Sequence, residues 1–148
     1  MTMFKKRKVC IVVASRANYG RVKSLMKAIS EHKDLELQLI VGASVMLYRF
    51  GKAVDVIRKD GFEPDRTIFY IVEGETLSTQ AKSTGLGMIE LSTAFESLMP
   101  DMVVTVADRF ETMATAVAAS YLNIPLVHIQ GGEISGNIDE KVRHGTSF

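Results

Sequence analysis

The chain carries the stretch KVCIVVASRANYGRVKSLMKAI at residues 8–29, and this stretch decides the fold. Its first part, residues 9–14, is apolar and mostly β-branched, which predicts a strand. Its second part places apolar residues at helical spacing, namely Val22, Leu25, Met26 and Ile29. We expect Asn18 to cap the helix that this spacing indicates. The stretch therefore predicts a strand followed closely by a helix.

The same alternation of short apolar runs and longer amphipathic stretches continues to residue 129. Four further runs predict strands at residues 35–41, 67–72, 102–106 and 124–129. Several of them are almost continuously apolar, as expected of strands that are covered on both faces in a parallel sheet. Because crossovers between parallel strands are right-handed, the pattern predicts an α/β fold with a doubly wound parallel sheet.

Glycines mark the ends and weak points of the remaining helices. The second helix is expected to end at residues 59–61, where a glycine follows Lys59 and Asp60. The third helical stretch, residues 76–99, contains Gly85 and Gly87, so it forms either two pieces or one loosened helix. The sequence has no repeat, low-complexity tract or Gly/Ser linker, and we therefore expect one domain over residues 1–148.

Composition and charge limit the possible partners. The 148 residues are 47% hydrophobic and 24% charged, which is typical of one globular domain. Lys and Arg number 18 and Asp and Glu 17, so the formal charge of +1 argues against nucleic-acid binding and against an anionic membrane surface. The apolar run at residues 9–14 is too short for a membrane span, and it lacks the A-x-A-like cleavage site of a signal peptide. The single cysteine, Cys10, is expected to be a buried small hydrophobe. These features predict a cytoplasmic protein.

In a parallel sheet of this kind, ligands bind beyond the carboxyl ends of the strands. The polar loops in those places are residues 15–20, 42–44, 108–109 and 130–133. The first of them lacks G-x-G-x-x-G, and no P-loop motif occurs, which argues against nicotinamide and P-loop nucleotide sites. Arg16, at the start of a helix, would suit an anion such as a phosphate, and the alternative is a solvated loop arginine.

Two further segments carry ionisable groups. Asp108 directly follows the fourth strand and is either a helix cap, with Glu111 completing a capping box, or a catalytic carboxylate. Residues 128–144 supply candidate acids, bases and anion contacts, namely Glu133, Asp139, Glu140, Arg143 and His144. Asp139 and Arg143 could instead form an i, i+4 surface pair. His128 is expected to be a packed strand histidine, and no residues have metal-site spacing.

Three motifs together resemble one enzyme family. Residues 15–20, 107–111 and 128–144 are similar, in this order, to motifs of the hydrolysing UDP-N-acetylglucosamine 2-epimerases. The resemblance runs from about Lys8 to His144. It implies that residues 1–148 form the Rossmann-like amino-terminal half of a two-domain GT-B-type fold, without the carboxyl-terminal UDP-binding domain. It further implies a homodimer.

The resemblance also implies a reaction. UDP-N-acetylglucosamine would lose its C2 proton and UDP to give 2-acetamidoglucal, and water would then add to give N-acetylmannosamine. This chemistry uses a UDP-sugar substrate and no metal or redox cofactor. It needs carboxylates to exchange protons and cations for the departing diphosphate. We expect residues 1–148 alone to have little or no activity, because a half-site loses orientation and water exclusion.

Site residues carry over by position in the motifs. Arg16 matches an arginine that contacts the UDP diphosphate, with Gly20 in the same loop. Asp108 and Asp139 match catalytic carboxylates. Arg109, Arg143 and His144 match polar positions that contact sugar or phosphate. Gln130 stands where relatives place a catalytic glutamate, and because an amide cannot exchange protons, it would only bind substrate. Either Glu133 takes over catalysis, or this branch of the family distributes the proton transfers differently.

Two alternatives remain open. The first is a hydrolysing epimerase for another UDP-2-acetamido sugar, such as a 2,4-diacetamido-trideoxyhexose, which would share the same motifs. The second is a catalytically silent, flavodoxin-like binding module, for which a glutamine at position 130 would be natural.

Overall fold

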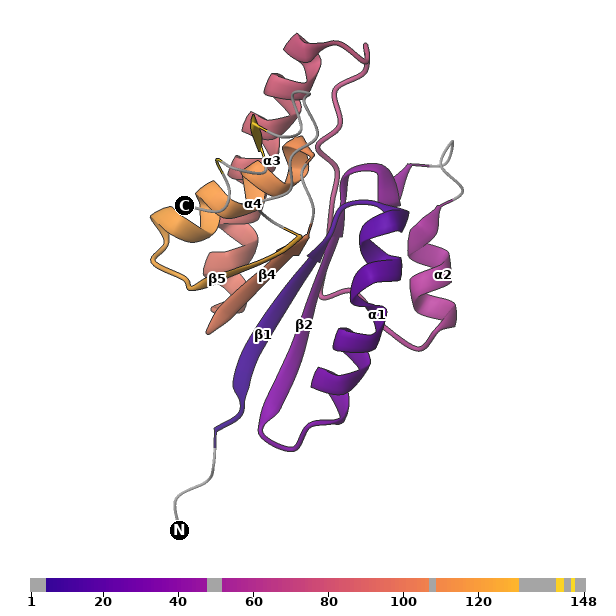
Figure 1. Ribbon diagram of the computed structural model, residues 1–148, viewed down its shortest axis with the longest axis vertical. Coiled ribbons are helices and arrows are strands. Elements are labelled where there is room, and N and C mark those ends of the chain that lie inside the picture. The colour runs from indigo at the N-terminus through magenta and orange to yellow at the C-terminus, as the bar shows by residue number, and fades with distance from the viewer. Residues whose placement is uncertain (1–4, 48–51, 107–108, 131–140, 143–144, 146–148) are drawn as a thin grey trace.

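The computed structural model describes residues 5–47, 52–106, 109–130, 141–142 and 145. Within these residues, five parallel strands form one sheet in the order β3-β2-β1-β4-β5. The strands are β1 (Arg7–Val13), β2 (Leu35–Gly42), β3 (Arg66–Ile68), β4 (Met102–Val106) and β5 (Leu126–Ile129). All five predicted strands are confirmed, and so is the α/β fold with a doubly wound parallel sheet (Figure 1).

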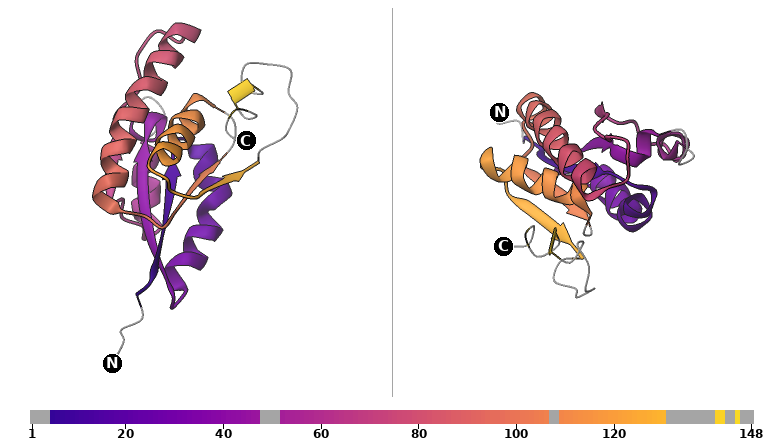
Figure 2. Two further views of the ribbon diagram at one scale, coloured as in Figure 1. Left: turned by 90° about the vertical axis from the view of Figure 1, so that its left-hand side faces the viewer. Right: turned by 90° about the horizontal axis from the view of Figure 1, so that it is seen from above.

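Helices cover both faces of the sheet. They are α1 (Arg16–Glu31), α2 (Ala53–Lys59), α3 (Leu77–Leu98) and α4 (Phe110–Tyr121), with a short 3-10 helix, η1 (Ala43–Met46), after β2. The left view of Figure 2 shows α3 and α1 on opposite sides of the sheet. The chain passes to one face for α1 and α2 and to the other for α3 and α4, so the direction of winding reverses between β1 and β4.

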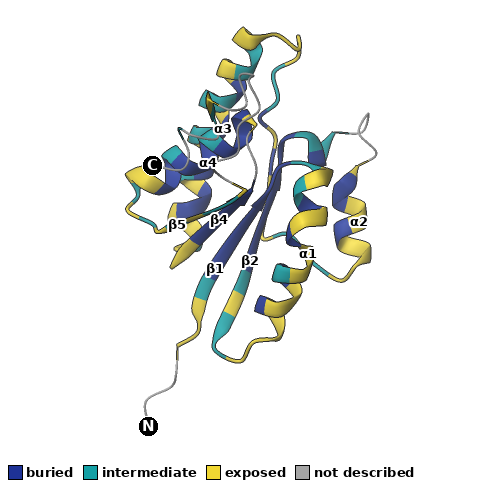
Figure 3. Cartoon of the chain, in the orientation of Figure 1, coloured by how far each residue is buried: buried dark blue, intermediate teal, exposed yellow. Residues whose placement is uncertain are grey.

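Two hydrophobic cores result from this arrangement. Alternate residues of β1 serve different cores, because successive side chains of a strand point to opposite faces. Ile11 packs in the core under α1 and α2, and Cys10 and Val12 pack in the core under α3 and α4. Figure 3 shows the buried residues concentrated in the central strands and on the inner faces of the helices. Cys10 is fully buried, as its place in an apolar run predicts.

The edge strands depart from the predicted pattern. The apolar run at residues 67–72 is longer than β3, because the chain leaves the sheet after Ile68. The backbone N–H of Val72 donates to Ser83 Oγ at 2.8 Å, and the Tyr70 side chain turns into the core beneath α3. The second half of this run therefore packs against α3 instead of pairing with β2. At the opposite edge, β5 is only partly covered, and Val127 is 39% exposed.

The helix boundaries confirm some expectations and correct others. The N-cap of α1 is Ser15 and not Asn18: the Asn18 N–H donates to Ser15 Oγ at 3.1 Å. The prediction for the end of α2 is confirmed, because the helix stops at Lys59 and Gly61 has a positive φ of 98°. Despite its glycines, α3 is one continuous helix of 22 residues, so the two-piece alternative is wrong. None of the helices in the described ranges has the length and apolar character that a membrane crossing requires.

Candidate functional site

A concave feature at the carboxyl edge of the sheet lies where the winding reverses. It is a cavity of about 580 Å³ between the start of α1, the start of α4 and the amino-terminal half of α3. The residues that line it are Ser15, Arg16, Ala17, Ser44, Ala53, Ile71, Val72, Glu75, Thr79, Gln80, Ser83, Arg109 and Phe110. A reversal point of this kind is where open α/β sheets bind their ligands.

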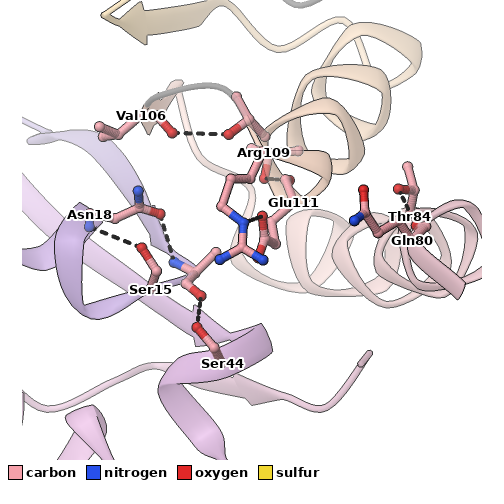
Figure 4. A network of polar contacts seen from close by, with 11 residues as sticks. Ser15, Asn18, Ser44, Gln80, Thr84, Val106, Arg109 and Glu111 are labelled. Carbon is pink, nitrogen blue, oxygen red and sulfur yellow. Dashed lines mark hydrogen bonds and ion pairs between the residues drawn. The ribbon is translucent and has the colours of Figure 1, made fainter. Parts of the chain in front are cut away.

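The loop between β1 and α1 forms one wall, and three hydrogen bonds hold it. The Asn18 backbone N–H donates a hydrogen bond to Ser15 Oγ, and the Asn18 side-chain Oδ1 accepts one from the Ala14 N–H at 3.2 Å. Ser44 Oγ, from η1, donates to the Ala14 carbonyl at 3.0 Å (Figure 4). Asn18 thus closes the loop without capping the helix. These bonds set Arg16, the first residue of α1, at the cavity.

The start of α4 forms the second wall. The Thr112 hydroxyl donates to the Val106 carbonyl at 2.9 Å and ties the first turn of α4 to the end of β4. Arg109 lines the cavity with a side chain that is 55% exposed, and its Nε lies 3.7 Å from Glu111 Oε2. Its guanidinium carbon lies 5.7 Å from the centre of the Phe110 ring. Arg109 is therefore held against two neighbouring side chains at the rim.

The third wall comes from the segment before α3 and from its first turns. The Thr76 and Thr79 side chains form a reciprocal capping box that fixes the start of the helix. This places Thr79, Gln80 and Ser83 on the cavity side, beside the apolar Ile71 and Val72. The wall therefore offers both hydroxyl and amide groups and an apolar surface. No motif in the sequence predicts that α3 contributes to the site.

The structure brings together two of the residues predicted for the site and separates others. Arg16 and Arg109 line the same cavity. Gly20 lies one turn further along α1 and borders a different surface depression, beside Lys23 and Asp60. Gln130 is exposed just after β5, with a positive φ of 63°, and is not part of the cavity lining. The remaining candidates lie outside the described residues, namely Asp108, Glu133, Asp139, Arg143 and His144.

Glu111 differs from its expected role. A capping box would place it at the third position of the helix, but it is the second residue of α4, whose N-cap is Arg109. Its side chain is only 3% exposed and is paired with Arg109.

His128, expected to be packed, is half-buried in β5. Over the part of the chain that the structure describes, no three His, Cys, Asp or Glu side chains gather closely enough to hold a metal ion.

Comparisons with known proteins identify the family of the chain. The family model for UDP-N-acetylglucosamine 2-epimerase matches residues 27–148. The GDP/UDP-N,N'-diacetylbacillosamine 2-epimerase (hydrolyzing) of Campylobacter jejuni is 38% identical over 143 residues, which are 96% of this chain and 37% of that protein. A UDP-N,N'-diacetylbacillosamine 2-epimerase (hydrolyzing) of Legionella pneumophila is 36% identical over 141 residues, or 95% of this chain and 37% of that protein. The UDP-N-acetylglucosamine 2-epimerase of Neisseria meningitidis is 32% identical over 142 residues, which are 96% of this chain and 37% of that protein.

Solved structures show the same fold. A crystal structure of a UDP-N-acetylglucosamine 2-epimerase superposes with a TM-score of 0.82 at 24% identity, over 96% of this chain and 39% of that one. The Neisseria meningitidis enzyme, solved with UDP-GlcNAc bound, gives a TM-score of 0.80 at 21% identity, over 95% of this chain and 38% of that one. The chain thus spans little more than a third of the length of these relatives. Because the family match covers most of the chain, this protein belongs to the UDP-N-acetylglucosamine 2-epimerase family.

Proposed function

We propose that this chain forms the phosphate-binding wall of a hydrolysing UDP-sugar 2-epimerase that converts UDP-N-acetylglucosamine and water into UDP and N-acetylmannosamine. The observation that carries the proposal is the cavity at the reversal point, with Arg16 and Arg109 on two of its walls. A diphosphate is a polyanion, and guanidinium groups bind phosphate oxygens through paired N–H donors. The start of α1 adds the partial positive charge of a helix N-terminus.

The reaction divides into two proton-transfer stages. A base removes the C2 proton while the C1–O bond breaks, which releases UDP and leaves 2-acetamidoglucal. Water then adds across the double bond, with its oxygen at C1 and a proton at the opposite face of C2. We assign the proton transfers to Asp108, Asp139 and Glu133 on the basis of the motifs. Arg143, His144 and Gln130 are proposed to bind the substrate, with Gln130 unable to transfer protons.

We propose that this wall works together with a second domain. The relatives are almost three times as long as the matched region, which leaves room for an opposing wall. A cleft between two walls would exclude water and hold the uridine, both of which contribute to catalysis. The isolated chain is therefore expected to bind UDP but to release UDP from substrate far more slowly than an intact relative. Homodimerisation and a cytoplasmic location stay predictions.

A second substrate has its own support. The two relatives named for N,N'-diacetylbacillosamine are 36% and 38% identical to this chain, against 32% for the UDP-N-acetylglucosamine 2-epimerase of Neisseria meningitidis. In that sugar, an acetamido group replaces the C4 hydroxyl of N-acetylglucosamine, and a methyl group replaces the hydroxymethyl group on C5. The mixed wall with Ile71, Val72 and Gln80 could receive either sugar. Parallel titration with UDP-N-acetylglucosamine and UDP-N,N'-diacetylbacillosamine compares the two, and the tighter ligand indicates the substrate.

Replacing Arg16 tests the phosphate site directly. We expect Arg16→Met to weaken UDP binding by roughly tenfold or more, because a charge-assisted contact to phosphate is lost. Isothermal titration with UDP measures the dissociation constant. Arg21→Met is the matched control, since Arg21 is exposed on α1 and does not line the cavity. Equal affinities of the Arg16 and Arg21 variants would rule out the proposed site.

A further inference from the structure

Glu111 is an unexpected residue to bury. It is the second residue of α4, and only 3% of its side chain is exposed. A carboxylate removed from water is costly unless other groups compensate its charge. The first turn of a helix compensates part of it, because the N-terminal end of the helix carries a partial positive charge. Among the described residues, a nearby cation is the guanidinium of Arg109.

Within the described residues, Glu111 and Phe110 contact only part of the Arg109 guanidinium group. Its Nε faces the Glu111 carboxylate at 3.7 Å, and its guanidinium carbon lies 5.7 Å from the centre of the Phe110 ring. These neighbours occupy the inner edge and one side of the guanidinium group. In Figure 4 the group extends away from α4, on the side where the loop with Ser15 lies. Ser15 and Arg109 line the same cavity, so the terminal nitrogens of Arg109 face the space in which a ligand would bind.

The charge of Glu111 also acts on Tyr70, which is buried in the core under α3 and α4. Burial, and then the negative charge of Glu111, raise the pKa of Tyr70. Tyr70 is 2% exposed and directly precedes Ile71 and Val72, which line the third wall. The Glu111 carboxylate therefore lies in the interior behind the cavity, near the joint between α4 and the segment that leads to α3. A group in this place can orient a rim residue without reaching the ligand itself.

We propose that Glu111 is a positioning residue: its buried carboxylate holds the Arg109 guanidinium so that the terminal nitrogens face the cavity and bind the diphosphate of a nucleotide sugar. The identity of the anion rests on the function proposed above, whereas the coupling between Glu111 and Arg109 does not. An arginine that is already oriented loses less side-chain freedom when it binds. Glu111 thus acts on affinity through Arg109.

A double-mutant cycle tests this coupling. UDP is titrated into the wild-type chain, Glu111→Gln, Arg109→Met and the double variant. We expect Glu111→Gln to weaken UDP binding by about fivefold in the wild-type background and to change it little when Arg109 is already methionine. Glu90→Gln is the matched control, because Glu90 is exposed on α3 and outside the cavity. A loss of the same size in both backgrounds would mean that Glu111 serves only the fold, and it would overturn the proposal.

An NMR measurement tests the same geometry without any ligand. The Nε–Hε signal of Arg109, assigned by its absence in Arg109→Met, should shift and exchange faster with water in Glu111→Gln. Glu111→Asp keeps the charge and should restore part of the wild-type signal and part of the affinity. Circular dichroism identifies any variant that fails to fold, and the aspartate variant then decides the outcome. An unchanged Arg109 signal in Glu111→Gln contradicts the proposal.

The results separate this proposal from the proposed function. If no variant, including the wild type, binds UDP, the function fails, and the Arg109 signal alone decides whether Glu111 positions it. If Arg16→Met abolishes UDP binding but Arg109→Met has no effect, the phosphate site stands and the role of Glu111 is wrong. If Arg16→Met and Arg109→Met each weaken UDP binding and the effects of Glu111→Gln and Arg109→Met are non-additive, both proposals are supported.

Discussion

Tyr19 joins α1 to the end of α2 through a side-chain hydrogen bond. Its ring is 5% exposed, and its hydroxyl donates to Asp60 Oδ2 at 2.7 Å. Lys23 Nζ lies 3.0 Å from the same oxygen. The hydrogen bond from Tyr19, followed by that from Lys23, lowers the pKa of Asp60. A carboxyl whose pKa is lower in the folded state stabilises the protein at neutral pH and loses this contribution in acid.

The pH dependence of unfolding tests this contact. As pH falls from the ordinary aspartate pKa of about 3.9 through the lowered pKa of the folded state, Asp60 becomes protonated and its contribution to the free energy of unfolding disappears. We therefore expect Tyr19→Phe to lower that free energy at pH 6 and to have a smaller effect at pH 2.5. Urea unfolding at the two pH values measures the difference. Glu63→Gln is the control, because Glu63 is exposed and pairs with Arg58 at the surface, where ion pairs contribute little. Equal losses at both pH values would show that the Asp60 charge is not involved.

Single residues of the site are predictable from the sequence where they lie just after a predicted strand. Arg16 and Arg109 were recognised because they follow predicted strands, and the structure places both at the cavity. Glu111 was recognised only as a possible cap, because nothing local distinguishes a buried glutamate from an exposed one. The cap of α1 was assigned to Asn18 instead of Ser15 for a similar reason: both residue types cap helices, and they lie only three residues apart.

Helix α3 contains two glycines, Gly85 and Gly87, whose surroundings differ in the structure although no sequence signal distinguishes them. An added Cβ at Gly85 would meet no atom within 4 Å. At Gly87 it would lie 3.0 Å from Ala114 Cβ and from the Tyr70 ring. Gly87 thus allows α3, α4 and the chain after β3 to approach one another. Gly85 has no such function, so the helix there only carries the conformational cost of a glycine.

Alanine substitutions distinguish the two positions. Gly85→Ala should raise the free energy of unfolding by about 1 kcal/mol, because alanine favours the helix and meets no neighbour. Gly87→Ala should lower it by about 1 to 3 kcal/mol, because overpacking at the junction outweighs the same gain in helix propensity. Urea unfolding with unchanged m-values measures both effects. Stabilisation of equal size at both sites would contradict the close packing of α3 against Tyr70 and Ala114.

At the level of elements, the prediction was most accurate in the centre of the sheet. The predicted runs at residues 9–14, 35–41 and 102–106 agree closely with β1, β2 and β4, because strands buried on both faces need continuous apolar sequence. The run at residues 67–72 predicted too long a strand. Its second half is apolar for packing under α3, and periodicity alone cannot separate that use from pairing with β2.

At the scale of the whole molecule, the reactivity of Cys10 measures how often the core under α3 and α4 opens. It is fully buried in β1, and it is the single cysteine of the chain. Burial, with a smaller contribution from the charge of Asp65, raises the pKa of its thiol to about 12. At pH 8 only about one buried Cys10 thiol in ten thousand would be ionised to the reactive thiolate. Cys10 should therefore react only after the core opens.

Thiol labelling tests this expectation. At pH 8, reaction with an aromatic disulfide reagent should be slow in native buffer and complete within minutes in concentrated guanidinium chloride. At intermediate denaturant, the rate should rise in proportion to the open population. Cys10→Ala is the blank, because it removes the only thiol. Stoichiometric labelling within seconds under native conditions would contradict a closed core around β1.

The sequence by itself determined the α/β class, the order of strands and helices, and the family. These depend on local periodicity and on motifs, which the chain carries wherever it folds. Only the tertiary structure decided which polar groups share one cavity, that α3 forms a wall of it, that Glu111 is buried behind Arg109, and that Gly87 but not Gly85 is needed for packing. The physical reason is that these properties depend on distances between residues far apart in the chain. The crossovers of the sheet set such distances, and no local pattern encodes them.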